Sequence, residues 1–103
     1  MEMYKAKRVE IIIEAPMERR LSKMLDEAGV KGYTILPVWG GSGHSGPWNR
    51  TGQVSSAGGM VSFICIVAPD RTEALLDTIY GFVARHIGVV SLSDCEVVRK
   101  ERF

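Results

Sequence analysis

The sequence predicts an α+β fold in which two β-α-β units share one four-stranded antiparallel sheet, with both helices on one face. Apolar residues alternate in short segments, as in strands, and recur every three to four residues in two longer segments, as in helices. The element order repeats once along the 103 residues, and a glycine-rich segment joins two halves of similar length. A chain of this length forms one modest core, so we expect a single domain over residues 1–103.

The first strand and the first helix are expected on either side of Pro16. Residues 8–15 alternate valine and isoleucine with other side chains, which predicts a strand. Pro16 suits the first turn of a helix, where its missing N–H is not needed, and the apolar spacing predicts that helix over 16–28. Gly29 fits the left-handed residue that follows a helix end.

A second strand and then a long loop are expected next. Residues 32–39 carry a run of apolar side chains, and Pro37, which has no N–H, places this strand at a sheet edge or a bulge. Residues 40–59 hold seven of the eleven glycines and one formally charged side chain, so they cannot form a core. We expect a long mobile loop, and loops of more than about 12 residues in a compact domain are usually functional or disordered.

The second half repeats the order of strand, helix and strand. Residues 60–67 predict a strand that is apolar on both faces, because residues 63–67 within it form an apolar run unbroken by polar side chains. A helix should follow with Asp70 as its N-cap, and Gly81 within it suggests close packing, since glycine lowers helix stability by about 1 kcal/mol. A fourth strand over 89–92, a polar step and a short last strand over 95–99 complete the chain.

This element order is the split β-α-β, or ferredoxin-like, plan. Both helices then cover one face of the sheet, and the chain has no third helix to cover the other. The strand expected over 60–67 is apolar on that second face as well. Because an exposed apolar face usually marks an interaction surface, we expect another copy of the chain to cover it, which makes the protein a homo-oligomer.

Composition and charge exclude several classes of protein. A formal net charge of +1 gives no support for a protein held on nucleic acid or on a membrane by its overall charge. Cys65 and Cys95 form no C-x-x-C pair, which argues against a disulfide scaffold or a zinc site and favours inert core thiols. The sequence has no membrane-spanning run and no signal-peptide core, so we expect a cytoplasmic protein.

The glycine-rich segment is the main candidate for a ligand site. Residues 41–46 fit G-x-G-x-x-G, but no helix follows, so the dinucleotide fingerprint lacks its context. The backbone N–H groups of such a segment can still surround an anion, and the alternative is a flexible linker. His44 is either a contact to phosphate or carboxylate or a solvated side chain. Trp48 is either a ligand or partner contact or an anchor for the loop.

The remaining polar residues favour a binding module over an enzyme. Arg99, Lys100 and Arg102 are cations near the C-terminus, and they could grip a phosphate if the last strand ends beside the glycine-rich segment. The default role of His86 is to cap the end of the second helix. We find no Ser-His-Asp pattern, no metal cluster and no suitable carboxylate pair, so we expect neither catalysis nor a bound metal.

Two segments resemble the PII signalling superfamily. Residues 29–34 read GVKGYT after the first expected helix, and residues 87–98 read IGVVSLSDCEVV. The second segment is similar to PII-like proteins of inorganic-carbon metabolism, both those paired with bicarbonate transporters and those associated with carboxysomes. The resemblance covers nearly the whole chain. It implies a homotrimer of ferredoxin-like subunits with adenine nucleotides between neighbours, and a T-loop over about 43–59 that reports the bound ligand to a partner protein.

The resemblance also implies which residues hold the ligands. Thr34 would face the adenine, the short B-loop would supply Gly88 and Val89, and Arg99, with Arg102 nearby, would grip the phosphates. The remaining nucleotide contacts would be the base of the T-loop at Gly40, Gly41, Ser42 and Gly43, and the strand backbone at Ser62, Phe63 and Ile64. Bicarbonate would be a second ligand near Gly41, Ser42, Gly43 and His44.

The chain departs from the classical family in three places. Residues 40–59 contain no tyrosine, so uridylylation is not expected. The B-loop is shortened to residues 85–88 and lacks the classical lysine, and Glu101 stands where the second arginine of the classical C-terminal pair falls. Since each added phosphate charge needs a partner, we expect ADP or AMP to bind more tightly than ATP.

Two alternatives remain open at the level of sequence. The first is a small ferredoxin-like enzyme with slow ATP hydrolysis. The second is an RNA-binding module of the same topology, which ranks lower because Phe63 lies in an apolar run without a neighbouring basic residue.

Overall fold

The computed structural model describes residues 1–43, 46–49 and 59–99. His44, Lys100, Glu101 and Arg102 therefore lie outside the described residues, as does most of the segment expected to form the T-loop. Among the described residues, no helix is long and apolar enough to cross a bilayer. In chain order the elements are β1 (Tyr4–Glu14), η1 (Ala15–Met17), α1 (Glu18–Glu27), β2 (Tyr33–Val38), β3 (Gly40–Gly43), β4 (Gly46–Asn49), β5 (Met60–Val67), α2 (Pro69–Ala84) and β6 (Gly88–Val97).

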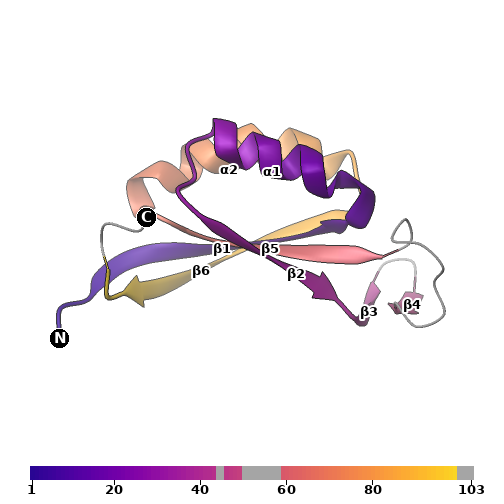
Figure 1. The fold of residues 1–103 in the computed structure, drawn as a ribbon, viewed down its shortest axis with the longest axis horizontal. Coiled ribbons are helices and arrows are strands. Elements are labelled where there is room, and N and C mark those ends of the chain that lie inside the picture. The colour runs from indigo at the N-terminus through magenta and orange to yellow at the C-terminus, as the bar shows by residue number, and fades with distance from the viewer. Residues whose placement is uncertain (44–45, 50–58, 100–103) are drawn as a thin grey trace.

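Four of the strands form one antiparallel sheet in the order β2-β5-β1-β6, and both helices cover the same face of it (Figure 1). This arrangement confirms the predicted ferredoxin-like α+β fold. Pro37 lies in β2, an edge strand, and pairs with Val61 of β5, so its missing N–H disrupts no central ladder. Gly29 has a φ of 82°, the left-handed conformation expected just after α1.

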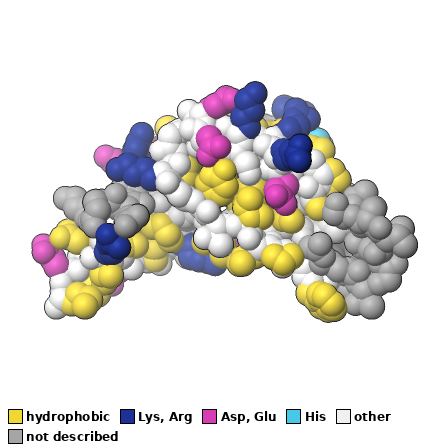
Figure 2. Space-filling view, in the orientation of Figure 1, with side chains coloured by type: hydrophobic (Ala, Val, Ile, Leu, Met, Phe, Trp, Pro, Cys, Tyr) yellow, Lys and Arg dark blue, Asp and Glu magenta, His cyan; other side chains and the backbone are white. Residues whose placement is uncertain are grey.

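The core lies between the sheet and the two helices. Val9, Ile11 and Ile13 alternate along β1 and face the helices, where each side chain is fully buried. Phe63 and Cys65 face the same way from the adjacent strand β5. Charged side chains gather over the outer surface of the helices (Figure 2). The helices bury against the sheet the apolar side chains of Leu21, Leu25, Leu75, Ile79, Phe82 and Val83.

The bounds of β1 and β6 differ from the sequence prediction. β1 begins at Tyr4 rather than residue 8, because β6 continues far enough to pair Val97 with Tyr4. The two short strands expected over 89–92 and 95–99 are one continuous strand, since the polar step at Ser93 and Asp94 lies on an edge strand. On an edge strand these polar side chains can reach solvent while the backbone stays paired with β1.

Two expectations about α2 are wrong. Its N-cap is Ala68 rather than Asp70, because Pro69 takes the first helical position, where its fixed φ fits and its missing donor costs nothing. Gly81 is exposed, and a β-carbon there would meet only the side chain of Arg85, at 3.8 Å. Close packing therefore does not require this glycine.

Part of the segment expected to be a loop forms a small hairpin. β3 pairs antiparallel with β4, so that Gly40 lies opposite Asn49 and Gly41 opposite Trp48. The hairpin continues the chain beyond the end of β2 and lies at one end of the main sheet (Figure 1). The expectation of a long loop over 40–59 is therefore wrong for residues 40–43 and 46–49, which form paired strands.

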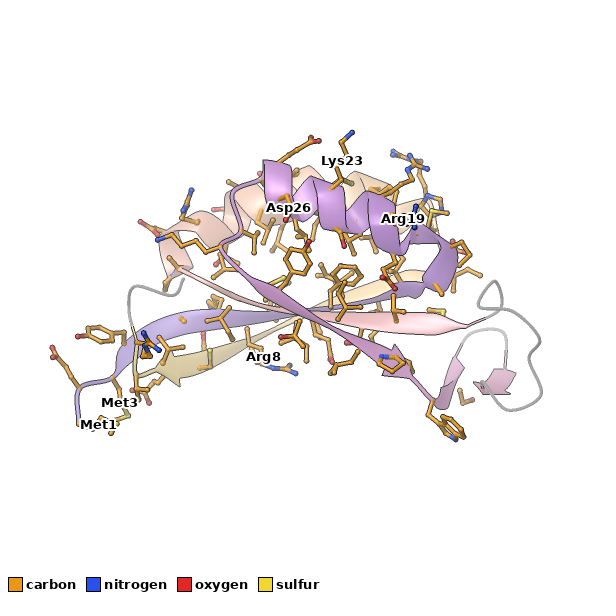
Figure 3. The ribbon with its side chains drawn as sticks, in the orientation of Figure 1. Met1, Met3, Arg8, Arg19, Lys23 and Asp26 are labelled. Carbon is orange, nitrogen blue, oxygen red and sulfur yellow. The ribbon has the colours of Figure 1, made fainter. Side chains whose placement is uncertain are left out.

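The sheet face opposite the helices is mixed in character. Because Val9, Ile11 and Ile13 face the helices, Arg8, Glu10 and Ile12 face the other way, and Figure 3 shows Arg8 on that side. Their neighbours on this open face are a mixture of aliphatic and hydroxyl-bearing side chains. The strand register places there Ile64, Ile66, Leu36, Val89, Thr34, Ser62, Ser91 and Ser93.

Candidate functional site

A groove of about 700 Å³ brings together three of the sequence-predicted ligand residues: Thr34, Ile64 and Arg99. Thr34 and Ile64 are cross-strand partners on the open face of β2 and β5. Arg99 follows β6 and lines the same groove from the chain's C-terminal segment. The groove is completed by Gly32, Tyr33, Ile66, Glu96, Val97 and Val98.

The groove suits a ligand with a flat apolar part and an anionic part. Ile64 and Ile66 supply aliphatic walls, and the hydroxyl of Thr34 can donate or accept a hydrogen bond. Arg99 provides a planar guanidinium, which recognises phosphate or carboxylate oxygens in bidentate fashion. The ring of Tyr33 lies on the opposite, helix-covered face, where it packs on Phe63 and its hydroxyl donates to a carboxylate oxygen of Asp26 at 3.1 Å.

The predicted ligand residues Gly40–Gly43, Gly88 and Val89 lie toward the other end of the sheet. Gly88 pairs with Ile13, Ile13 with Val61, and Val61 with Pro37, so these residues form one row across the sheet. The Thr34–Ile64 row lies three residues further along β5, a separation of about 10 Å at the rise of a strand. β3, which holds Gly40–Gly43, continues beyond the end of β2, and Figure 1 shows it at the end of the sheet away from the C-terminal segment.

A phosphate grip by Arg99 beside the glycine-rich segment required the last strand to end next to that segment. Within a single chain this condition is not met. β6 begins, rather than ends, at the end of the sheet that carries the glycine-rich segment. Arg99 follows the far end of β6 and lies apart from Gly40–Gly43. An antiparallel strand of ten residues carries its two termini to opposite ends of the sheet, which is why sequence proximity to Gly88 does not keep Arg99 nearby.

The expected backbone role of Ser62, Phe63 and Ile64 stays a prediction, and the sheet limits how it could work. β5 lies between β1 and β2 and is paired with both over these residues, so its N–H and C=O groups are used in the two ladders. Phe63 is fully buried against the helices and offers no surface. Of the three residues, Ile64 reaches the groove, and it does so with its side chain.

A polar cluster on the open face was not found from the sequence. The hydroxyl of Ser62 donates to Glu10 Oε2 at 3.2 Å, and Arg8 Nη2 lies 3.9 Å from the same oxygen. Ser62 is only 5% exposed even within the single chain. The alternation along β1 places these charges on the face away from the helices, but only the strand register shows that Ser62 is their neighbour.

A second cluster missed by the sequence analysis surrounds Glu14 at the end of β1. Glu14 Oε1 lies 3.1 Å from His86 Nδ1 and accepts a hydrogen bond from the backbone N–H of Ile87 at 3.3 Å. The His86 ring also packs on Phe82, with ring centroids 4.8 Å apart. The side chain of His86 therefore links α2 to β1 and does not cap the helix, whereas its backbone N–H donates to Val83 O at 3.0 Å in the last turn.

The chain's family follows from comparison with known proteins. A family model described as "Nitrogen regulatory protein P-II" matches residues 6–102. The chain belongs to the PII family. A search of the curated proteins finds no match.

Solved structures extend the PII comparison. The chain is 31% identical to CPII, a PII-like protein from Thiomonas intermedia K12 bound to ADP, AMP and bicarbonate, with a TM-score of 0.90 over 99% of this chain and 96% of that one. A CPII structure bound to ADP and bicarbonate shares 32% identity, with a TM-score of 0.85 over 99% and 97% of the two chains. A PII-like signaling protein from Thermus thermophilus shares the fold, with 24% identity, a TM-score of 0.83 and coverage of 100% and 99%.

The first strand of the hairpin, where the expected T-loop of the PII fold begins, is exposed. Gly41 and Ser42 are exposed, and Trp39, just before β3, is 73% exposed. The bicarbonate candidate His44 lies outside the described residues, as do the side chain of Trp48 and the phosphate candidate Arg102. The site at this end of the PII fold is therefore described only through Gly40–Gly43, Gly88 and Val89.

The cysteines of this PII protein have no part in the groove. Burial raises the pKa of the Cys65 thiol to about 11, so the buried side chain stays protonated and unreactive. Cys95 is half-buried on β6. Within the described residues, no group of His, Cys, Asp and Glu is arranged to hold a metal ion.

Proposed function

We propose that this chain is a PII-like regulatory protein that binds ADP or AMP, and bicarbonate, in clefts between the subunits of a homotrimer. The observation that carries the proposal is the division of the candidate ligand residues between the two ends of the sheet. Thr34, Ile64 and Arg99 line one groove, whereas Gly40–Gly43 and Gly88–Val89 lie at the other end. One subunit supplies half of a site, and a neighbour supplies the complementary half.

The open face of the sheet supports the assembly. It presents the exposed side chains of Leu36 and Val89 and the half-buried side chains of Ile12 and Ile64, on the face that the helices leave uncovered. An apolar sheet face of this kind is stabilised by burial against another copy. A trimer in which these faces meet brings the groove end of one subunit toward the loop end of the next.

The chemistry of the two half-sites supports an adenine nucleotide as ligand. The aliphatic walls and the hydroxyl of Thr34 suit the base, and Arg99 suits a phosphate. On the neighbouring subunit, backbone N–H groups around Gly40–Gly43 and Gly88 suit the phosphate oxygens. The CPII structures that hold ADP, AMP and bicarbonate support the same ligands here.

The ligand acts by shifting populations of the segment over about 43–59. A nucleotide or bicarbonate ion that binds one arrangement of this T-loop more tightly increases its population, and a partner protein reads the result. The partner belongs to the inorganic-carbon system, as a bicarbonate transporter or a carboxysome-linked component, and the protein acts in the cytoplasm. It is a sensor rather than an enzyme.

Isothermal titration and sedimentation test the proposal together. The protein should sediment as a trimer and release heat with ADP and AMP, with ATP binding no more tightly than either, and bicarbonate should change the nucleotide affinity. Monomeric sedimentation together with the absence of heat for all three nucleotides contradicts the proposal. Steady turnover of ATP that falls in a Ser42→Ala variant would favour the slow hydrolase instead.

A further inference from the structure

The end of β1 joins three segments that are far apart in the sequence. The backbone N–H of Glu14 donates to Ile87 O at 3.1 Å, and the next N–H, that of Ala15, donates to Gly59 O at 2.9 Å. Ile87 immediately precedes the expected B-loop glycine, and Gly59 ends the segment expected to be the T-loop. We call the group Glu14, Ala15, Gly59, His86 and Ile87 the Glu14 junction.

The side chain of Glu14 closes this junction. Its Oε1 atom accepts from Ile87 N at 3.3 Å and lies 3.1 Å from His86 Nδ1. Residues 14 and 87 are thus joined by two hydrogen bonds running in opposite directions, one backbone to backbone and one backbone to side chain. The side chains of Glu14 and His86 are 26% and 23% exposed, so water competes only partly for these bonds.

The residue that follows the junction has no room to shift toward the sheet. A β-carbon on Gly88 would lie 2.9 Å from Ile12 O and 3.1 Å from a methyl carbon of Val83. The Gly88 backbone is therefore packed directly on β1, while Ile87 is held from the other side by Glu14. A ligand that contacts the backbone of Gly88 would therefore bind a segment whose position depends on Glu14, a residue of β1.

We infer that Glu14 is a positioning residue for nucleotide binding, which fixes the Ile87–Gly88 backbone through its carboxylate and couples that turn to Gly59 at the end of the T-loop. The inference rests on the proposed nucleotide function and deepens it. Glu14 contacts no ligand itself. At this end of β1 two consecutive N–H groups bind two different segments. The N–H of Glu14 donates to Ile87 O beside the B-loop glycine, and that of Ala15 donates to Gly59 O at the end of the T-loop.

The test compares two substitutions of Glu14 with a control substitution in α2, the helix that carries His86 to the junction. Glu14→Ala removes both side-chain bonds, and Glu14→Gln keeps an oxygen that can accept from Ile87 N–H. The control is Thr72→Ala, which removes a buried hydroxyl that donates to Ala68 O at 3.0 Å, at the end of α2 away from His86. Melting temperature and ADP affinity by calorimetry are measured on each full-length protein.

The expected result separates positioning from general stability. Glu14→Ala should weaken ADP binding about 10-fold, the equivalent of about 1.4 kcal/mol. Thr72→Ala should lower the melting temperature but leave ADP affinity within about 2-fold, and Glu14→Gln should restore most of the affinity. ADP binding that is unchanged in Glu14→Ala, or reduced equally in the control, overturns the inference.

Hydrogen exchange without ligand distinguishes failure of this inference from failure of the proposed function. In Glu14→Ala the amides of Ala15, Ile87 and Gly88 should exchange faster, and in the wild type ADP should slow exchange at Met60 as well. If the wild type binds no adenine nucleotide, the proposed function fails. If ADP binds but exchange at Met60 does not respond, the coupling through Glu14 fails while the proposed function stands.

Discussion

A β-carbon on Gly88 would lie 2.9 Å from the carbonyl oxygen of Ile12. That oxygen belongs to a central strand and cannot move without breaking the β1–β6 ladder. Gly88 is therefore required by the close approach of β6 to β1. Its backbone angle does not require glycine, because among the described residues the glycine with a positive φ is Gly29.

Gly88→Ala should destabilise the fold by about 1–3 kcal/mol, the usual cost of overpacking a tight site. Urea unfolding monitored by circular dichroism measures the change. Gly81→Ala is the matched control, because Gly81 is exposed in α2 and alanine should stabilise that helix by up to about 1 kcal/mol. Equal stability of the Gly88→Ala protein and the wild type contradicts the close approach.

Ile12→Glu should dissociate the assembly. Ile12 lies on the open sheet face that the proposed trimer buries, and three glutamates brought together there would repel one another and lose their hydration. Sedimentation should find monomers, and ADP binding should be lost with the clefts. Tyr80→Glu provides the control, because Tyr80 is exposed on α2 and its substitution should leave the trimer intact. A trimeric Ile12→Glu protein would place the subunit contact elsewhere.

Arg99→Gln should weaken ADP binding by about 10-fold or more, since a hydrogen bond to a charged group contributes about 1.5–3 kcal/mol. The remaining affinity should also depend less on salt, because one charge pair is lost. Arg19→Gln is the control, as Arg19 is an exposed arginine on the outer surface of α1 (Figure 3). Calorimetry at two salt concentrations measures both effects, and equal losses in the two variants argue against phosphate contact by Arg99.

Cys65 should resist alkylation in the folded protein. Burial raises the pKa of its thiol to about 11, so at a labelling pH of about 8 almost none of it is the reactive thiolate. Iodoacetamide labelling followed by peptide mass spectrometry should find Cys65 unmodified until urea unfolds the chain. Rapid labelling of Cys65 in native buffer would show that β5 opens without global unfolding.

The ion pair between Asp94 and Lys7 should make the free energy of unfolding depend weakly on pH in the acid range. A hydrogen bond from Lys7, reinforced by its charge, lowers the pKa of Asp94 below the ordinary value of 3.8. The charged carboxylate therefore stabilises the fold above pH 3.8, and this contribution is lost as the pH falls through the lowered folded pKa. Asp94→Asn should melt slightly below the wild type at neutral pH, and the difference should vanish in strong acid. The effect is small because the pair is exposed at the sheet edge.

Local patterns were enough to predict the order of strands and helices. Alternation along residues 8–15 and helical spacing over 16–28 report directly which side chains are buried, and Gly29 and Pro37 carry backbone constraints of their own. The same reasoning failed where a partner strand decides the outcome. Tyr4 belongs to β1 because Val97 lies opposite it, and residues 40–43 are a strand because residues 46–49 return beside them.

For the candidate ligand residues, the sequence likewise indicated the residue types but not which of them lie together. The residue types that suit a nucleotide, such as the glycines over 40–43 and the arginine at 99, can be recognised from the sequence. Their grouping could not, because an antiparallel strand separates Gly88 from Arg99 by its full length and brings Thr34 to Ile64 from a different part of the chain.

The sequence by itself determined the α+β class, the two-sided apolar strand and the family resemblance, since each depends on the type and spacing of neighbouring residues. Only the tertiary structure decided that β5 is a central strand paired on both sides, and that Arg99 lies far from Gly40–Gly43 and Gly88. It also brought Glu14 to His86 and Ile87. These are contacts between residues distant along the chain, and they depend on strand register and on the path of a turn, which short-range patterns do not specify.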